Sequence, residues 1–318
     1  MQAREHPNIF RADGWGKLRF TSMFWGLCRP TPMPILRTLM ALAAVLSMSL
    51  APLQTAGAQT REAGYRFSPV NQYDIPLMAA YWNPIVQYVS DKSGVKLTLK
   101  IARTSADTTA YVLTQEVEFV FSNHLFSPER EQLGWKVFGR RQVPPILGQI
   151  VVPEDSPITR LEQLKGQEVA FAGPEAFVIY KVPYAHLLNS GIDIKVVFGG
   201  NQNGALAQLF AGKVQAAGGN SQLIEGYAKR EGKKFRVLWS SEPFNDLALM
   251  VSGKVPAKDA QAVADAFLGM HQDPVGREVL RQTAQTVGLP VDAYFIPATS
   301  ADYAAYRRFY QSAPPQLR

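Results

Sequence analysis

Residues 161–171 constrain the fold of this chain more than any other stretch. The sequence LEQLKGQEVAF begins with one amphipathic turn, meets a glycine at position 166 and continues into the apolar run Val169-Ala170-Phe171. Glycine commonly ends a helical turn because it adopts left-handed backbone angles without steric cost. A short apolar run bounded by turn signals is typical of a buried strand. The segment therefore predicts a turn that feeds a strand inside an α/β sheet.

Strands and helices are predicted to alternate on both sides of this segment. Before it, strands are expected over residues 65–70, 96–101, 118–121 and 147–152, with helices over 106–113 and where Leu77, Tyr81, Ile85, Tyr88 and Val89 fall at helical spacing. After it, strands are expected over 168–171, 194–198, 216–218, 235–239 and 247–251, with helices over 178–188, 205–211 and 223–231. Such alternation predicts an α/β fold with largely parallel sheets covered on both faces.

The C-terminal part is predicted to be mostly helical from Gly253 onward. Ala260, Val263, Ala264, Phe267 and Leu268 form one apolar helix face. A late aromatic cluster of Tyr303, Tyr306, Phe309 and Tyr310 is expected to pack back on the first part of the chain.

From Tyr65 to about Thr286 this order of elements resembles that of the phosphate/phosphite/phosphonate-binding proteins of ABC transporters, which have the type II periplasmic binding protein fold. The unit at 161–171 is similar to the one that opens the second lobe of such proteins. The resemblance implies two α/β lobes joined by two crossover strands, with the solute held in the cleft between them. Residues 59–149 plus 250–318 would form lobe one, residues 150–249 lobe two, and residues 1–58 a presegment with a secretory signal peptide.

The expected export signal lies between Met33 and Ala58. Arg37 precedes the short apolar run 39–46, and Ala56-Gly57-Ala58 supplies the small residues of a cleavage site. This pattern is typical of a cleaved secretory signal and too short for a membrane span. We therefore expect a periplasmic protein that begins at Gln59, encoded from Met1, Met23 or Met33.

Charge and cysteine usage narrow the function classes. The presegment 1–58 holds six basic and two acidic residues, so of 33 basic and 26 acidic residues the remainder keeps 27 and 24, a net charge of +3. This small excess does not indicate nucleic-acid binding. The single cysteine, Cys28, precedes the apolar run, so thiolate catalysis and zinc-thiolate sites are not expected in the exported chain. We expect a monomer with no catalytic residues, no metal and no cofactor, whose partners are a small-molecule solute and a membrane ABC permease.

Loops that follow strand ends are expected to line the cleft and supply the candidate ligand-binding residues of the first lobe; they are residues 71–73, 103–105 and 122–124. Arg103 could clamp an anion, whereas Thr104 serves either the site or the cap of the next helix. Ser122, Asn123 and His124 follow a buried strand where the resembling family places a loop with hydrogen-bonding groups. A neutral structural role for the histidine is the alternative.

The second lobe offers a corresponding set. Asn201 and Asn203 lie in a glycine-flanked loop that either wraps a ligand or simply turns the chain, and Asn220 and Ser221 follow a further strand. Aromatic residues beside the loops could stack on an organic ligand, although core packing is the common alternative; they are Tyr73, Phe177 and Tyr180.

One loop departs from the resembling family. Where that family carries hydroxyl side chains that hold a phosphorus oxyanion, this sequence has Glu175-Ala176-Phe177-Val178. We therefore expect phosphate and phosphonates to bind weakly, and the ligand to be less anionic and partly apolar. Two other functions keep the same fold: a sensory domain that reports to a membrane kinase or chemoreceptor, and an enzyme such as hydroxymethylbilane synthase, which would need a cysteine that the exported chain lacks.

Overall fold

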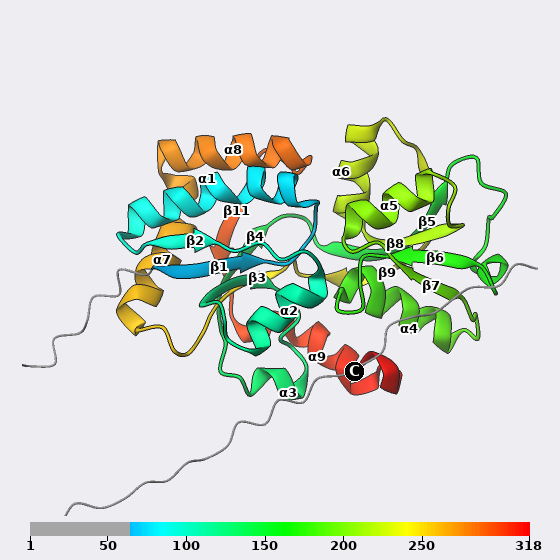
Figure 1. Cartoon of the computed structure of the whole chain (residues 1–318), viewed down its shortest axis with the longest axis horizontal. Helices are drawn as coiled ribbons and strands as arrows, with labels where there is room; N and C mark the ends of the chain where they lie inside the picture. Colours follow the sequence, from blue (N-terminus) through cyan, green and yellow to red (C-terminus); the bar gives the residue numbers. More distant parts are fainter. Residues whose placement is uncertain (1–63) are drawn as a thin grey trace, which may run out of the picture. The chain divides into compact units, whose positions relative to one another are not determined.

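A computed structural model describes residues 64–318 of the chain, which contain two β-sheets flanked by helices (Figure 1). The first sheet has the strand order β11-β4-β10-β3-β1-β2, and the second has the order β7-β6-β8-β5-β9. The predicted export signal lies outside the described residues. None of the helices described is long and apolar enough to cross a membrane.

The first sheet mixes parallel and antiparallel strands. Strand β1 pairs in parallel with β2 and β3, whereas β10 runs antiparallel to β3 and β4, and β11 antiparallel to β4. Its strands are β1 (Tyr65–Pro69), β2 (Leu97–Leu99), β3 (Phe119–Ser122), β4 (Lys136–Gln142), β10 (Ala248–Val251) and β11 (Tyr294–Pro297). The helices between and after them are α1 (Ile75–Ser93), α2 (Ser105–Leu113), α3 (Pro128–Glu131), α7 (Ala257–Gly269), α8 (Pro274–Val287) and α9 (Ala304–Ser312).

The second sheet is built around β6, which pairs in parallel with β7 and β8, while β5 runs antiparallel to β8 and β9. Its strands are β5 (Ile146–Pro153), β6 (Glu168–Phe171), β7 (Lys195–Phe198), β8 (Ala216–Asn220) and β9 (Phe235–Phe244). Its helices are α4 (Val182–Asn189), α5 (Gln202–Phe210) and α6 (Ser221–Glu231). The turn at the start of segment 161–171 is a short 3-10 helix, Leu161–Leu164, and the strand after it is β6.

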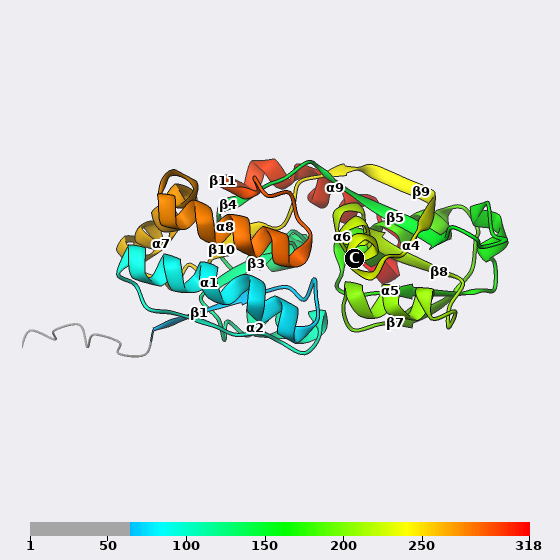
Figure 2. The same ribbon diagram turned by 90° about the horizontal axis from the view of Figure 1, so that it is seen from above.

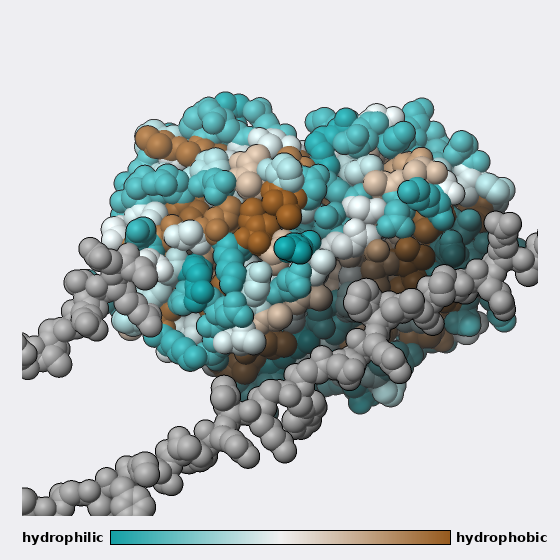
Figure 3. Space-filling view, viewed as in Figure 1, coloured by the Kyte–Doolittle hydropathy of each residue, from teal (hydrophilic) through white to brown (hydrophobic). Residues whose placement is uncertain are grey.

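Helix α1 packs on the first sheet through apolar side chains at helical spacing. The helix buries Met78, Trp82, Ile85 and Val89, because residues three and four apart share one face. The ring of Trp82 lies 4.9 Å from that of Phe67 in β1, centroid to centroid. On the face drawn in Figure 3, the outer surface is mainly hydrophilic, and hydrophobic residues show mostly in hollows between helices and sheets.

The predicted helix over 178–188 is two elements in the structure. Residues Phe177–Lys181 form a π-helical turn, and α4 follows from Val182. Pro183 lacks the N–H that an α-helix would donate to the carbonyl of Ile179, and its ring would clash with that carbonyl. The proline therefore widens the turn before it, and π turns of this kind are frequent at functional sites.

Two short links, residues 143–145 and 245–247, join the sheets, and β5 and β10 each pair only within their own sheet among the residues described. Figure 2 shows helix α9 lying beside these links. The late aromatic cluster packs on the first lobe as predicted, since Tyr303 stacks on Phe126 with ring centroids 4.4 Å apart. The cluster also reaches the second lobe, where Phe177 lies 4.3 Å from Tyr306 and 4.9 Å from Phe309. The C-terminal helix therefore packs on both lobes.

Candidate functional site

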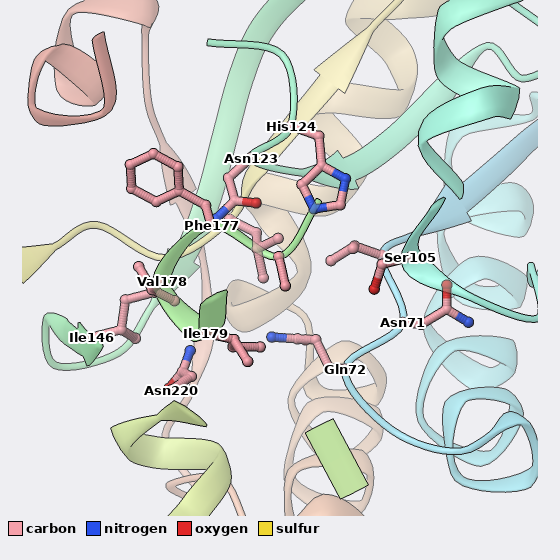
Figure 4. A pocket seen from close by; sticks show the side chains of 13 residues that line it. Asn71, Gln72, Ser105, Asn123, His124, Ile146, Phe177, Val178, Ile179 and Asn220 are labelled. Atoms are coloured by element: carbon pink, nitrogen blue, oxygen red, sulfur yellow. The ribbon is translucent and has the colours of Figure 1, made fainter. Parts of the chain in front are cut away.

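A small pocket lies where loops of the two lobes meet the links (Figure 4). Its cavity volume is about 30 Å³, which is room for a water-sized group. Polar and apolar residues share the lining: Val70, Asn71, Gln72, Ser105, Asn123, His124, Ile146, Ala176, Phe177, Val178, Ile179, Asn220 and Leu247.

Two consecutive amides follow β1 and differ in how they are bonded. Asn71 donates from Nδ2 to the carbonyl oxygen of Ala102 at 2.6 Å and accepts from Thr108 Oγ1 at 2.6 Å. Gln72 is 3% exposed, and its Oε1 has no hydrogen-bond partner within residues 64–318. Figure 4 shows the Gln72 side chain reaching into the pocket toward Ile179, whereas the amide of Asn71 turns away. Gln72 thus turns its amide nitrogen into the pocket, while its buried Oε1 has no partner among the described residues.

The hydrogen bonds of His124 define its tautomer. The hydroxyl of Thr109 donates to the carbonyl oxygen of Ser105 at 3.0 Å and also lies 2.6 Å from His124 Nδ1. Both contacts are satisfied only if Nδ1 carries the proton and donates to Thr109 Oγ1, because the hydroxyl has one hydrogen. Burial lowers the pKa of His124 to about 4, so the ring is neutral at pH 7. Its Nε2 is therefore an acceptor, and Figure 4 shows this nitrogen turned into the pocket.

Glycines in the second sheet let the π-helical turn approach the pocket closely. A Cβ at Gly148 would lie 2.5 Å from the carbonyl oxygen of Val178, and one at Gly218 would lie 2.5 Å from that of Ile179. No side chain fits at such distances, so glycine at these positions allows the backbone of the turn to rest on β5 and β8. The same backbone then forms one wall of the pocket.

The charged groups beside the pocket are largely engaged with one another. Arg130 Nη1 donates to Glu175 Oε2 at 2.6 Å and to the carbonyl oxygen of His124 at 2.9 Å. Burial has the largest single effect and acts to raise the pKa of Glu175, but the hydrogen bond from Arg130 and the nearby positive charges together outweigh it, so the pKa is lowered. Lys181 is 5% exposed, and its Nζ lies 5.1 Å from the ring centroid of Tyr310. Glu175 is thus a paired carboxylate and not a free charge at the edge of the pocket.

A second set of contacts joins the two lobes at the rim. Asn203 donates to Asp74 Oδ2 at 3.4 Å, and Arg230 donates to the carbonyl oxygen of Val287 at 3.2 Å. Close by, a Cβ at Gly226 would lie 3.1 Å from that same carbonyl oxygen. The lobes therefore meet through backbone at this point, and only a small residue fits between them.

Sequence comparison decides the family. Residues 67–303 match the family described as "ABC transporter, phosphonate, periplasmic substrate-binding protein". The chain belongs to this family. No curated protein matches the sequence.

Solved structures share the fold of this binding protein at low sequence identity. PhnD1 from Prochlorococcus marinus (MIT 9301), in complex with methylphosphonate, has a TM-score of 0.65 at 14% identity over 78% of this chain and 97% of that chain. A binding protein component of an ABC phosphonate transporter from Pseudomonas aeruginosa has a TM-score of 0.67 at 14% identity, covering 78% and 86%. A Xanthomonas citri protein bound to ATP has a TM-score of 0.58 at 17% identity, covering 78% and 94%. The predicted two-lobed α/β fold is confirmed.

Some of the residues predicted to bind ligand line the pocket of this binding protein, namely Asn123, His124, Phe177 and Asn220. Asn220 also caps α6 by accepting from the N–H of Gln222 at 3.0 Å. The ring of Phe177 points away from the pocket centre and packs into the C-terminal aromatic cluster. Phe177 therefore forms a wall rather than a stacking platform.

Other predicted residues lie outside the pocket lining because they hold the backbone. Thr104 accepts from the N–H of Asp107 and caps α2, and Asn201 accepts from the N–H of Gly204 and caps α5. Ser122 accepts from the N–H of His124 at 3.1 Å, and Ser221 from that of Leu147 at 3.2 Å. For Thr104, the cap is the role that the structure shows.

The remaining predicted residues are absent from the lining for other reasons. Arg103 is exposed and does not reach the pocket, and Asn203 lies at the rim. Tyr180 packs against Phe171, with ring centroids 5.1 Å apart. Tyr73 is 1% exposed beside Tyr81, and burial raises the pKa of its hydroxyl.

Several lining residues were not singled out from the sequence. Gln72 and Ser105 lie in the predicted cleft loops, so their position after a strand was the available signal. Ile146 and Leu247 lie where the links join the sheets, and apolar residues there carry no signal that separates a pocket wall from core.

Proposed function

We propose that the protein captures a small solute at the residues that line this pocket, which widens when the lobes open, and delivers the solute to a membrane ABC permease. The observation that carries the proposal is the pocket lining itself, which combines Gln72 and His124 of the first lobe with Ile179 and Asn220 of the second. A solute held by both lobes favours the state in which they are together, and closure around a ligand is a common hinge motion. The family match supports transport over the sensory alternative.

The finer organisation is part of the same proposal. We place lobe one at residues 59–145 plus 248–318 and lobe two at residues 146–247, a few residues from the expected boundaries because β5 starts at Ile146 in the second sheet and β10 at Ala248 in the first. The site lies at the junction. The exported protein starts at Gln59 after signal cleavage, stays a monomer in the periplasm and performs no catalysis. Mass spectrometry of the exported protein tests the cleavage site, and retention of the apolar run 39–46 would contradict it.

Phosphate and phosphonates are expected to bind weakly. Two cations lie beside the pocket: Glu175 already accepts a hydrogen bond from Arg130 at 2.6 Å, and the ammonium of Lys181 lies over the ring of Tyr310. The turn 175–178 offers no hydroxyl group. Each missing charge-assisted hydrogen bond weakens binding by roughly 1.5–3 kcal/mol, so two missing bonds cost at least about a hundredfold in affinity.

A bulky substitution where the two lobes meet tests the capture mechanism. Gly226→Trp cannot fit against the carbonyl oxygen of Val287, so we expect a larger radius of gyration in solution scattering and weaker solute binding. Gly269→Trp is the matched control, since nothing lies within 4 Å of a Cβ there. A wedge variant that keeps both the compact scattering profile and full affinity would contradict closure.

A further inference from the structure

We infer that Arg130 and Glu175 form a latch between the two lobes, so that the chain's own residues hold the closed arrangement and must separate before a solute can enter. Phe177, two positions after Glu175, adds an apolar anchor to the same contact. The inference goes beyond the proposed function, because it concerns what opposes opening when no solute is bound.

The ion pair of the latch crosses from one lobe to the other. Arg130 lies in α3 of the first lobe and Glu175 follows β6 of the second; Arg130 Nη1 lies 2.6 Å from Glu175 Oε2, and each side chain is 21% exposed. Among the described residues, it is the only ion pair that joins the lobes apart from Arg141–Asp246 at the second link. A partly buried pair is screened less than an exposed one, so it can bias the position of the lobes.

The first lobe holds the guanidinium of Arg130 in place. Its Nη1 also donates to the carbonyl oxygen of His124 at 2.9 Å, so the charge faces the second lobe from a fixed position. Burial acts to raise the pKa of Glu175, but Arg130 and the charge of Lys181 help to lower it below the ordinary value. The carboxylate is therefore ionised at pH 7, and the lobes are joined by a charge-assisted hydrogen bond, which is stronger than a neutral one.

The apolar anchor belongs to the second lobe and is buried against the first. The ring of Phe177 is 1% exposed and lies 4.3 Å from that of Tyr306, which in turn lies 5.4 Å from Phe126 of the first lobe. The backbone just after Phe177 rests on Gly148 and Gly218 of the second sheet, so the ring moves with that sheet. Opening therefore withdraws a buried ring from the aromatic cluster and exposes apolar surface to water, which opposes the motion.

The latch controls access because the closed pocket is small. Its cavity of about 30 Å³ takes a water-sized group, and Gln72 of the first lobe reaches toward Ile179 of the second across it (Figure 4). A solute of several heavy atoms therefore enters only when residues 175–179 have moved away from residues 122–124. Contacts that hold these segments together reduce the fraction of protein that is competent to bind, and the apparent affinity falls by that fraction.

Pulsed EPR of the exported protein measures the opening without any solute. Nitroxide labels are placed on Ala110→Cys in α2 of the first lobe and on Ala207→Cys in α5 of the second, both at exposed helix positions. Residues 59–318 contain no natural cysteine, so the labels attach only there. The unaltered latch should give mainly the short distance between the labels.

Variants of the two latch residues should open the lobes. We expect Arg130→Met and Glu175→Met each to raise the ratio of long to short distances by about fivefold. Glu116→Met is the control, because the Lys100–Glu116 pair lies within the first lobe and should leave the distances unchanged. Unchanged distances in both latch variants would overturn the inference. A lower melting temperature without any longer distances would also overturn it, since the pair would then be purely structural.

The double variant tests whether the two residues act as a pair. If they do, Arg130→Met combined with Glu175→Met opens the lobes no further than either substitution alone, because the first substitution already removes the interaction. Additive effects of the two substitutions would contradict a latch made by their contact.

The outcomes separate the latch from solute capture. The latch variants are measured without solute, whereas Gly226→Trp tests closure around one. If the latch variants leave the distances unchanged while Gly226→Trp weakens binding, the latch is wrong and the proposed function stands. If the latch variants open the lobes while Gly226→Trp keeps the compact profile and full affinity, the latch stands and capture by closure is contradicted.

Discussion

Arg141 and Asp246 form a fully buried ion pair at the junction of the two lobes. Nε of Arg141, near the end of β4, donates to Oδ2 of Asp246 in the second link at 2.7 Å, with side chains only 2% and 1% exposed. Arg141 also donates to the hydroxyl of Tyr81, and the hydroxyl of Tyr303 donates to the backbone of Asp246. The pair therefore fixes the second link to the first sheet.

Asp246→Ala should strongly destabilise the protein because it leaves the buried guanidinium of Arg141 unpaired. Breaking a buried pair in this way typically costs about 3–5 kcal/mol. Urea unfolding of the exported protein measures the loss, and Arg141→Met in the same chain should recover part of it. Glu154→Ala is the control, because the Lys234–Glu154 pair is 3.7 Å apart and its side chains are 80% and 61% exposed. Equal losses from the two single variants would contradict the structural role of the buried pair.

Phe177→Ala should destabilise the contact between the C-terminal helix and the second lobe. The ring of Phe177 is 1% exposed and packs against Tyr306 and Phe309. Truncating a buried phenylalanine costs about 3–5 kcal/mol. Phe198→Ala, at a ring that is 44% exposed, should cost clearly less in the same denaturant series. Equal losses of unfolding free energy in Phe177→Ala and Phe198→Ala would contradict the packing of α9 against Phe177.

Glu175→Gln should increase oxyanion affinity, because it releases the guanidinium of Arg130 from its charged partner. One regained charge-assisted hydrogen bond corresponds to roughly 1.5–3 kcal/mol, or about a tenfold to hundredfold gain. Calorimetry with phosphate, phosphite, methylphosphonate and aminoethylphosphonate measures this, with the exposed Glu162→Gln as control. Submicromolar binding to the unaltered protein would refute the expected weak binding. Replacing Glu175 and Ala176 by Ser and Thr adds hydroxyls and should raise affinity further.

Acid should destabilise the protein partly through His124. Burial lowers the pKa of His124 from 6.5 to about 4, so the unfolded chain takes up a proton over this range before the folded protein does. Stability therefore falls as the pH drops from about 6.5 to about 4, by up to roughly 3 kcal/mol from this group. The nearby charges act on the same pKa: the carboxylate of Glu175 raises it, and the positive charges of Arg130 and Lys181 lower it.

His124→Gln should flatten the pH dependence of unfolding free energy in that window, whatever its effect on stability at pH 7. His186 also has a pKa lowered by burial, so a residual slope is expected, and His186→Gln provides the comparison. An unchanged slope in His124→Gln would show that the imidazole is not held neutral.

Local patterns in the sequence were sufficient for most of the fold. Strand β6 spans residues 168–171 as predicted, because its run of apolar residues lies between turn signals. Strand β4 was not predicted, since the buried Arg141 interrupts the alternation that would mark a half-buried strand. Strand β11 is only four residues long and ends in proline, so it gives little periodic signal.

The candidate site was predicted only as far as its loops. The sequence showed that residues 71–73, 103–105 and 122–124 follow strand ends. This position correctly predicted that Asn123 and His124 would line the pocket. Which side chains are free to bind was not visible, because that depends on bonds with distant partners. The side-chain amide of Asn71 is hydrogen-bonded to Ala102 and Thr108. By contrast, Oε1 of its neighbour Gln72 has no hydrogen-bond partner among the described residues.

The sequence by itself determined most of the order of strands and helices, because these elements depend on residues close together in the chain, and that order indicated the family. The tertiary structure alone decided the electrostatics of the site. Arg130 and Glu175 are 45 positions apart and Arg141 and Asp246 are 105 apart, so neither pairing leaves a local pattern. Burial makes each pairing decisive, since a charge removed from water needs a partner within hydrogen-bond reach. The charge of a side chain can be seen in the sequence, but its partner is set by the packing of the two lobes.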